Sequence, residues 1–253
     1  MSEASFFNTL LVAMFAMAII VFTILFFISA PYGRHNRKGW GPDVDNRLAW
    51  LIMEAPSPVL FGLLFLAGSN PVNAVMLAFV ILWEGHYLHR AFIYPFTLND
   101  NGKRMPVLIM VFGLVFNLMN AYLNGRWLFH FSSGYGEGWV YDPRFVAGVV
   151  LFAVGFIINR RADLELKSLR QDGDGGYHIC NRRFHRLVSC PNYLGEIIIW
   201  IGWAMATWSL PGLAFALWTI ANLAPRARAH HNWYRETFPD YPPERKALVP
   251  RIW

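Results

Sequence analysis

The stretch CPNYLGEIIIWIGWAMATWSLP, residues 190–211, begins with polar side chains and continues as a long apolar run. Asn192, Tyr193 and Glu196 stand in its first two turns, and residues 197–208 carry no charge. A helix needs about 20 mostly apolar residues to cross the hydrocarbon core of a bilayer, so this stretch predicts a membrane helix. Its polar opening is compatible with a binding site, although an Asn followed by a Glu is also ordinary helix capping.

The composition of the whole chain also indicates a membrane protein. Of its 253 residues, 55% are hydrophobic and 15% are charged, whereas soluble domains average roughly 25% charged residues. Trp, Tyr and Phe make up 17% of the chain, and aromatic residues gather at membrane interfaces. The N-terminus lacks the basic region of a cleavable signal peptide. Two cysteines, Cys180 and Cys190, predict neither a disulfide framework nor a metal-binding set.

Seven apolar segments predict seven membrane-spanning helices. The segments are residues 8–29, 47–67, 72–95, 106–124, 144–162, 192–209 and 211–226. The Ser-Leu-Pro-Gly reversal at residues 209–212 predicts that the last two helices form a hairpin. We therefore expect an all-α, seven-helix membrane bundle that forms a single domain over residues 1–253.

The positions of the 22 Lys and Arg residues predict the orientation of this bundle. Almost all of them lie in the connections after the first, third and fifth segments and in the C-terminal tail, whereas Arg126 and Arg144 lie on the opposite side. Because cytoplasmic loops are enriched in Lys and Arg, the N-terminus is expected outside and the C-terminus in the cytoplasm. This topology explains the net charge of +6, so nucleic-acid binding is not expected.

An ionisable side chain inside an apolar segment marks a candidate site, because such groups are costly in hydrocarbon. Glu54 lies inside a predicted span and is followed by Pro56 and Pro58, which interrupt helical hydrogen bonding. Broken backbone at membrane depth is tolerated where it is buried in protein or lines a cavity. We favour a Glu54 carboxyl group that faces a substrate cavity over a simple helix kink near the interface.

A second polar group lies in WEGHYLHRAFIYPF, residues 83–96. Tyr87, Arg90 and Tyr94 share one helix face, and Glu84 precedes Tyr87 by one turn. So many polar side chains are not expected to face lipid. For all of these polar residues except Tyr87, hydrogen bonding within the bundle is as good an explanation as a role in a binding site.

Two cytoplasmic features accompany the polar opening of the first stretch. Asn159, Asp163 and Arg170 fall on one face of a helix that continues from the fifth span, although such a stripe is often solvated surface. The motif HHNWY, residues 230–234, adds histidines and a tyrosine near the membrane surface. These features place a candidate pocket at the cytoplasmic ends of the helices.

Metal and dinucleotide motifs do not explain these residues. A di-iron desaturase needs several histidine clusters at helical spacing, whereas the paired histidines here are only residues 86/89 and 230/231, so no metal is expected. The chain contains neither GxGxxG nor GxxxxGK[ST]. A nucleotide would instead be held by Arg and Asn side chains at helix ends, since the planar Arg fork suits phosphate.

Several motifs, in order along nearly the whole chain, resemble one enzyme family. They are PYGRH (31–35), MEAPSP (53–58), HYLHRAFIYP (86–95), INRRADLELKSLR (158–170), NYLGEIIIWIGWAMATWSLP (192–211), HHNWY (230–234) and YPPERKALVPRIW (241–253). Together they resemble the steroid 5α-reductases, or 3-oxo-5α-steroid 4-dehydrogenases, in a bacterial-type form. The resemblance implies a seven-helix membrane enzyme that uses NADPH to reduce the Δ4 bond of a 3-oxosteroid to the 5α product, with hydride added at C5 and a proton at C4.

The resemblance also implies roles for individual residues. Glu54 and Tyr87 would contact the substrate ketone and act in catalysis, with Met53 beside them in the substrate site. The residues that would contact the cofactor are Tyr32, Arg34, Asn101, Lys103, Asn159, Asp163, Arg170, Tyr177, Asn192, Glu196, Arg226, His230 and Tyr234. The chain departs from the family at Met53, where Gln is usual, and at His178, where Arg is expected. The lost amide bears on how a steroid is oriented.

Three alternatives to a steroid reductase stay open at this stage. A reductase of another apolar enone lipid is one, because of Met53. The C-terminal motifs are shared more loosely with S-adenosylmethionine-dependent isoprenylcysteine carboxyl methyltransferases, but methyl transfer does not need Glu54 and Tyr87. A non-enzymatic lipid-binding protein would have no reason to keep the cofactor residues.

For the enzyme, we expect a multi-pass integral membrane protein, in the inner membrane if its source is bacterial. The cofactor site would face the cytoplasm, and the apolar substrate would enter from the bilayer. Membrane lipid is the other expected partner, and a monomer is the expected state.

Overall fold

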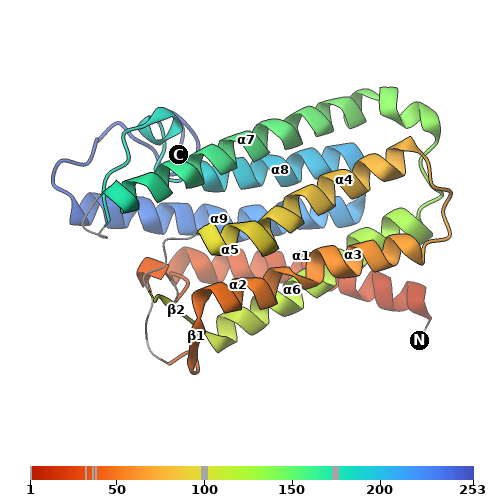
Figure 1. Cartoon of the computed structure of the whole chain (residues 1–253), viewed down its shortest axis with the longest axis horizontal. Coiled ribbons are helices and arrows are strands. Elements are labelled where there is room, and N and C mark those ends of the chain that lie inside the picture. Colours follow the sequence, from red (N-terminus) through yellow and green to blue (C-terminus); the bar gives the residue numbers. More distant parts are fainter. Residues whose placement is uncertain (1, 32, 36, 38, 98–101, 173–176) are drawn as a thin grey trace. The chain divides into compact units, whose positions relative to one another are not determined.

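A computed structural model of the chain describes residues 2–31, 33–35, 37, 39–97, 102–172 and 177–253 (Figure 1). For Arg34 and residues 170–172 it describes the backbone only. The chain divides into two compact units. The first comprises Met1–Ala13, Ala30–Val146 and Thr207–Gly212, and the second comprises Met14–Ser29, Ala147–Ala206 and Leu213–Trp253. The assignment of the whole chain to a single domain stays a prediction.

Capping side chains fix the starts of two helices of the first unit, α2 and α4. The Asp45 carboxylate accepts hydrogen bonds from the backbone N–H groups of Arg47 and Leu48, and Asn73 accepts one from Met76, which satisfies donors that a helix start leaves open. The elements in order are η1 (Gly33–His35), β1 (Asp43–Asp45), α2 (Asn46–Glu54), α3 (Pro56–Leu66), α4 (Ala74–Leu88), η2 (His89–Ile93), α5 (Tyr94–Thr97), β2 (Arg104–Pro106), α6 (Val107–Arg126), η3 (Trp127–Phe131) and η4 (Glu137–Tyr141). Strands β1 and β2 pair antiparallel, with Val44 opposite Met105.

Helix α6 is the support on which α2 and α3 pack (Figure 1). A Cβ on Gly113 would overlap the Met53 thioether, and one on Gly125 would lie 2.8 Å from the Leu64 side chain. Both glycines therefore let the side chains of the neighbouring helices sit directly on the α6 backbone. The helix α1 (Glu3–Phe27) joins this unit through its first turns, where Glu3 forms two hydrogen bonds with Arg126, of 2.7 and 2.8 Å.

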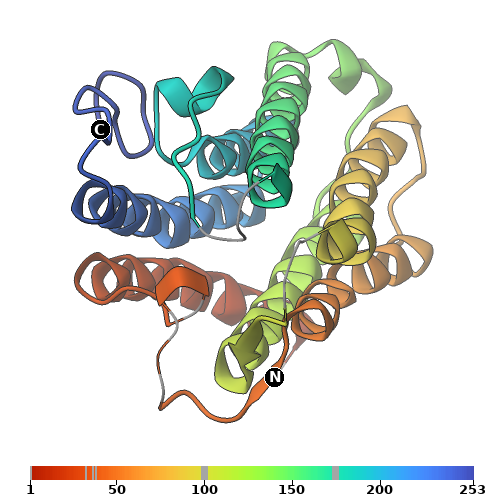
Figure 2. The same ribbon diagram turned by 60° about the vertical axis from the view of Figure 1, so that its left-hand side comes forward.

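The second unit contains η5 (Arg183–Arg186) and most of α7 (Pro143–Asp172), α8 (Pro191–Thr207) and α9 (Leu210–Thr237). Helices α7 and α8 lie side by side (Figure 2). A Cβ on Gly155 of α7 would lie 2.6 Å from the carbonyl oxygen of Gly195 on α8, and a Cβ on Gly202 would lie 2.6 Å from that of Gly148. Small residues of this kind allow membrane helices to approach until their backbones touch.

The helices confirm the helical class expected from the apolar segments. Each predicted segment overlaps a helix or a continuous run of helices, and residues 72–95 contain α4, η2 and the first half of α5. Among the described residues, four helices are long and apolar enough to cross a membrane. They are Glu3–Phe27, Asn46–Leu66, Val107–Phe131 and Pro143–Leu169. The seven-span count and the orientation stay predictions.

Candidate active site

Glu54 lies at the end of α2, where the chain turns into α3 at Pro56, and its side chain is buried. The Asn117 amide of α6 donates to the Met53 carbonyl oxygen at 2.8 Å and to Glu54 Oε2 at 3.4 Å. Arg90 Nε lies 3.5 Å from Glu54 Oε1. Each carboxylate oxygen therefore has a polar neighbour, an amide of α6 at Oε2 and a guanidinium group of η2 at Oε1.

Tyr87 lies on α4 and is also buried. The Asn120 amide donates to its hydroxyl oxygen at 3.4 Å, and the Asn124 amide donates to Asn120 Oδ1 at 3.0 Å. The Tyr87 ring packs against Trp83, with centroids 4.9 Å apart. Because the phenol accepts the bond from Asn120, this contact does not use the phenolic proton.

Three asparagines of α6 were not predicted from the sequence as site residues. Asn117, Asn120 and Asn124 follow i, i+3, i+7 spacing, which places them on one face of the helix. All three are buried. A signal was available, because buried polar side chains in a membrane helix need partners. Through Asn117 and Asn120, one turn of α6 contacts both predicted catalytic residues.

The π-helical turn η2 positions Arg90 between the predicted catalytic residue and an aromatic pair. Its guanidinium carbon lies 4.9 Å from the Trp50 ring centroid and 5.5 Å from that of Tyr94. The two rings themselves meet edge to face at 5.5 Å. Aromatic faces attract a cation, so Arg90 is held on one side by the rings and on the other by Glu54.

The second unit brings four predicted cofactor residues into one network between α7 and α8. The Asn159 amide donates to the Asn192 carbonyl oxygen at 3.0 Å and to Glu196 Oε2 at 3.1 Å. The Asn192 amide donates to Asp163 Oδ1 at 3.1 Å. Trp200 Nε1 donates to Glu196 Oε1 at 2.9 Å, so both carboxylate oxygens of this buried group have a donor. The close helix contact at Gly155 and Gly195 makes these short bonds possible.

Tyr193 links two further predicted residues. Its hydroxyl lies 3.1 Å from Arg226 NH2 and 3.1 Å from His230 Nε2, both on α9. The Arg226 guanidinium carbon also lies 5.3 Å from the Tyr193 ring centroid. Tyr193 was not among the predicted cofactor residues, although its position between Asn192 and Glu196 was a signal for it.

The remaining predicted residues make other contacts where their side chains are described. Tyr177 contacts Trp233 at a centroid distance of 5.2 Å, and Tyr234 stacks on Tyr241 at 5.4 Å. Lys103 is exposed, and its carbonyl oxygen accepts from the Asn46 N–H at 3.2 Å. Tyr32 and Asn101 lie outside the described residues. For Arg34 and Arg170 only the backbone is described, in η1 and α7 respectively.

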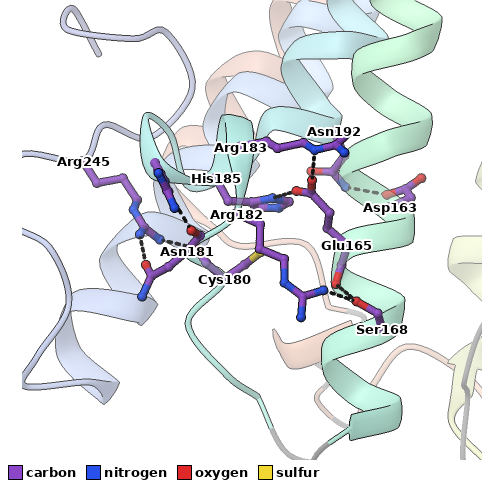
Figure 3. A network of polar contacts seen from close by, with 11 residues as sticks. Asp163, Glu165, Ser168, Cys180, Asn181, Arg182, Arg183, His185, Asn192 and Arg245 are labelled. Atoms are coloured by element: carbon purple, nitrogen blue, oxygen red, sulfur yellow. Dashed lines mark hydrogen bonds and ion pairs between the residues drawn. The ribbon is translucent and has the colours of Figure 1, made fainter.

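A further polar network ties the connection before α8 to α7 (Figure 3). His185 Nδ1 lies 3.0 Å from Glu165 Oε2, and Arg183 Nε lies 3.5 Å from Glu165 Oε1. The Arg245 guanidinium group donates to the Cys180 carbonyl oxygen at 3.1 Å and to Asn181 Oδ1 at 2.6 Å. These bonds hold the connection to α7 and to the C-terminal tail.

Glu165, Cys180 and His185 present potential metal ligand atoms within 4.8 Å of one another. Burial raises the pKa of the Cys180 thiol and lowers the pKa of His185. A neutral thiol is a poor metal ligand, and guanidinium groups surround the cluster. We therefore assign these three residues to the anchoring of the connection.

Comparison with known proteins supports one family. Residues 103–253 match the family described as 3-oxo-5-alpha-steroid 4-dehydrogenase. The chain is 43% identical to a steroid 5-alpha-reductase DET2 of Gossypium hirsutum, over 100% of this chain and 99% of that protein. It is 35% identical to 3-oxo-5-alpha-steroid 4-dehydrogenase 1 of Bos taurus, over 93% of this chain and 92% of that protein. It is 39% identical to the Homo sapiens protein of the same name, over 88% and 86%.

Proposed function

Because the chain belongs to the 3-oxo-5-alpha-steroid 4-dehydrogenase family, we propose that it reduces the Δ4 double bond of 3-oxosteroids with NADPH. In this reaction the C4–C5 double bond gains a hydride at C5 and a proton at C4, which gives the 5α-3-oxosteroid. The observation that carries the proposal is the contact of Glu54 and Tyr87 with adjacent asparagines of α6. This places the two predicted catalytic side chains on one buried surface.

The arrangement suits a reaction in which negative charge develops on the ketone oxygen. Donors fixed in advance at that oxygen lower the barrier, and they do so most strongly in a site from which water is excluded. Tyr87 is the proposed donor, because the Asn120 amide bonds its oxygen and orients the ring. Glu54, held by Asn117 and Arg90, would fix the position of the ketone relative to Tyr87.

The polar groups of the second unit fit a nicotinamide dinucleotide by their chemistry. Arg226 and His230 supply donors suited to phosphate, and Tyr193 between them offers an aromatic face. The amides of Asn159 and Asn192 and the nearby carboxylates of Asp163 and Glu196 suit the carboxamide of a nicotinamide and the hydroxyl groups of a ribose. NADPH, when bound, supplies the hydride. We propose the same role for the remaining candidates, Tyr32, Arg34, Asn101, Lys103, Asp163, Arg170, Tyr177, Glu196 and Tyr234.

A reductase of another apolar enone lipid is the second candidate, and Met53 favours it. The Met53 thioether sits on the backbone of Gly113, and it offers no amide to a substrate. Substrate choice would then depend on shape more than on a hydrogen bond at this position. In either case we propose a multi-pass, monomeric enzyme whose cofactor site faces the cytoplasm and whose substrate enters from the bilayer.

The first test identifies the nucleotide and the product. The protein is purified in detergent and denatured, and the released nucleotide is analysed by mass spectrometry. The protein is then incubated with NADPH or NADH and progesterone. We expect NADP(H) in the extract and an NADPH-dependent product two mass units heavier than progesterone. NADP(H) without a product would support the second candidate, and S-adenosylmethionine in the extract would overturn both.

A further inference from the structure

An open groove of about 480 Å³ lies between α7 and the connection around residues 182–186. Its lining combines four guanidinium groups with one carboxylate, one hydroxyl and one leucine side chain. The lining residues are Arg161, Leu164, Glu165, Ser168, Arg182, Arg183 and Arg186. The groove is therefore strongly cationic, and none of its residues belongs to the candidate active site.

Hydrogen bonds anchor two arginines of the groove. Arg182 NH1 donates to Ser168 Oγ at 2.8 Å, and Arg186 Nε donates to the Asn181 carbonyl oxygen at 2.9 Å. Each of these bonds uses one nitrogen of a group that has three. Arg161 and Arg186 are exposed. The Glu165 carboxylate is shared between Arg183 and His185, so one anionic group faces four cationic ones.

An exposed apolar stripe on α7 leads into this groove. Val150, Val154 and Ile157 are 56%, 43% and 52% exposed, and Leu164 is 50% exposed. Together with Arg161 they follow the spacing i, i+4, i+7, i+11, i+14, which is one continuous helix face.

This face is distinct from the one that carries the cofactor network. Asn159 and Asp163 of α7 bond residues of α8. The groove residues of α7 bond the connection around residues 181–186 instead. The groove is therefore a separate site on the same helix.

We propose that this groove binds the phosphate headgroup of an anionic phospholipid, whose acyl chain lies along the stripe formed by Val150, Val154 and Ile157. The planar Arg fork matches phosphate oxygens in pairs. Basic pockets beside membrane helices bind anionic headgroups. A soluble phosphate would satisfy the arginines but would make no use of the apolar stripe, so the continuity of the two features selects a lipid. The site does not depend on the proposed enzymatic function.

Native mass spectrometry of the detergent-purified protein tests this site. The protein is mixed with phosphatidylglycerol or with phosphatidylcholine of the same acyl chains. We expect preferential retention of phosphatidylglycerol. The Arg161→Gln/Arg186→Gln double variant should retain it at least about tenfold less, because each basic residue near a membrane surface contributes to anionic lipid binding. Millimolar inorganic phosphate should not displace it.

Arg235→Gln is the matched control, because Arg235 is also an exposed cation, in the last turn of α9. It should retain phosphatidylglycerol as the wild type does. An Arg161→Lys/Arg186→Lys variant, which keeps the charge but loses the planar fork, should lie between the wild type and the glutamine variant. Equal retention of both lipids, an unaffected glutamine variant or displacement by phosphate would overturn the proposal.

Discussion

At the scale of single residues, the candidate chemistry depends on pairs rather than on isolated groups. Tyr87 is oriented by Asn120, and Glu54 is held by Asn117 and Arg90. In each pair, a group proposed to contact the substrate is bonded by a neighbouring side chain that fixes its position. Such preorganisation is what makes a hydrogen-bond donor effective in a transition state.

Replacing Tyr87 by Phe should remove the proposed donor to the ketone. We expect turnover to fall by about 10²–10³-fold, the usual loss for one such donor, while NADPH binding changes little because Tyr87 lies outside the cofactor network. Steady-state kinetics and a separate NADPH binding measurement distinguish the two effects. Tyr141→Phe is the control, because Tyr141 is 84% exposed. Near-normal turnover of the Tyr87 variant would exclude Tyr87 as the donor.

Asn117→Leu should test the support of Glu54. The change removes the amide that bonds the Met53 carbonyl oxygen and the Glu54 carboxylate, and the loss of a buried hydrogen-bond partner costs roughly 1–3 kcal/mol. We expect a lower melting temperature in detergent and lower turnover. Asn232→Leu, at an exposed position of α9, should change neither. A fully stable and active Asn117 variant would mean that this amide does not position the carboxylate.

The sequence could identify Glu54 and Tyr87 because charged or polar groups in apolar segments are conspicuous. It could not show which residues support them, because a helical spacing says which residues share a face and not which helix that face meets. Asn117 contacts Glu54 and Asn120 contacts Tyr87 because α6 packs beside α2 and α4, and the sequence does not predict that packing. Tyr193 was noted in the polar opening but not assigned to the cofactor for the same reason, since its partners Arg226 and His230 lie on another helix.

At the scale of the elements, the cofactor network depends on how closely α7 and α8 approach. The apolar segments predicted both helices, but they could not predict the glycine contacts, because glycine in a helix has no signal of its own. Gly155 and Gly195 meet backbone to backbone. The amide of Asn159 reaches Asn192 and Glu196 across this contact.

Gly195→Ala should therefore separate the two helices. The added Cβ would lie 2.5 Å from the backbone nitrogen of Asn159 and 2.7 Å from the Gly155 carbonyl oxygen, and a backbone clash of this kind typically costs about 1–3 kcal/mol. We expect a lower melting temperature and weaker NADPH binding. Gly85→Ala in α4 is the control, since a Cβ there meets nothing within 4 Å. Comparable melting curves for both variants would show that the contact is not tight.

Two histidines, His185 in the connection before α8 and His231 on α9, should make stability depend on pH. Burial lowers the pKa of His185 and of His231, and Arg235, Lys246 and Arg245 act in the same direction on His231. In the unfolded chain both histidines titrate near pH 6.5, so below that pH the unfolded chain binds more protons than the folded one. Stability is then fully present above about pH 6.5 and is lost as the pH falls towards the folded-state pKa values.

Unfolding curves in detergent at about pH 7.5 and pH 5.5 measure this dependence. The His231→Gln variant should lose part of it, because the remaining glutamine does not titrate in this range. A stability that rises on acidification would contradict the direction assigned to both histidines.

At the scale of the whole molecule, the apolar segments and the charge pattern predict an odd number of spans. Ser2 and Glu137 should then face the outside, and Ile252 should face the cytoplasm. Single-cysteine variants test this, made in a chain whose buried Cys180 and Cys190 are replaced by alanine. Ser2, Glu137 and Ile252 are all exposed, so each new thiol is open to reagent.

A membrane-impermeant maleimide applied to intact cells should label Ser2→Cys and Glu137→Cys but not Ile252→Cys, which should react only after the membrane is opened. Because cytoplasmic loops are enriched in Lys and Arg, the charge pattern predicts this orientation. Labelling of Ser2→Cys and Ile252→Cys from the same side would require an even number of spans. That result would overturn the seven-span topology predicted from the apolar segments and the charge pattern.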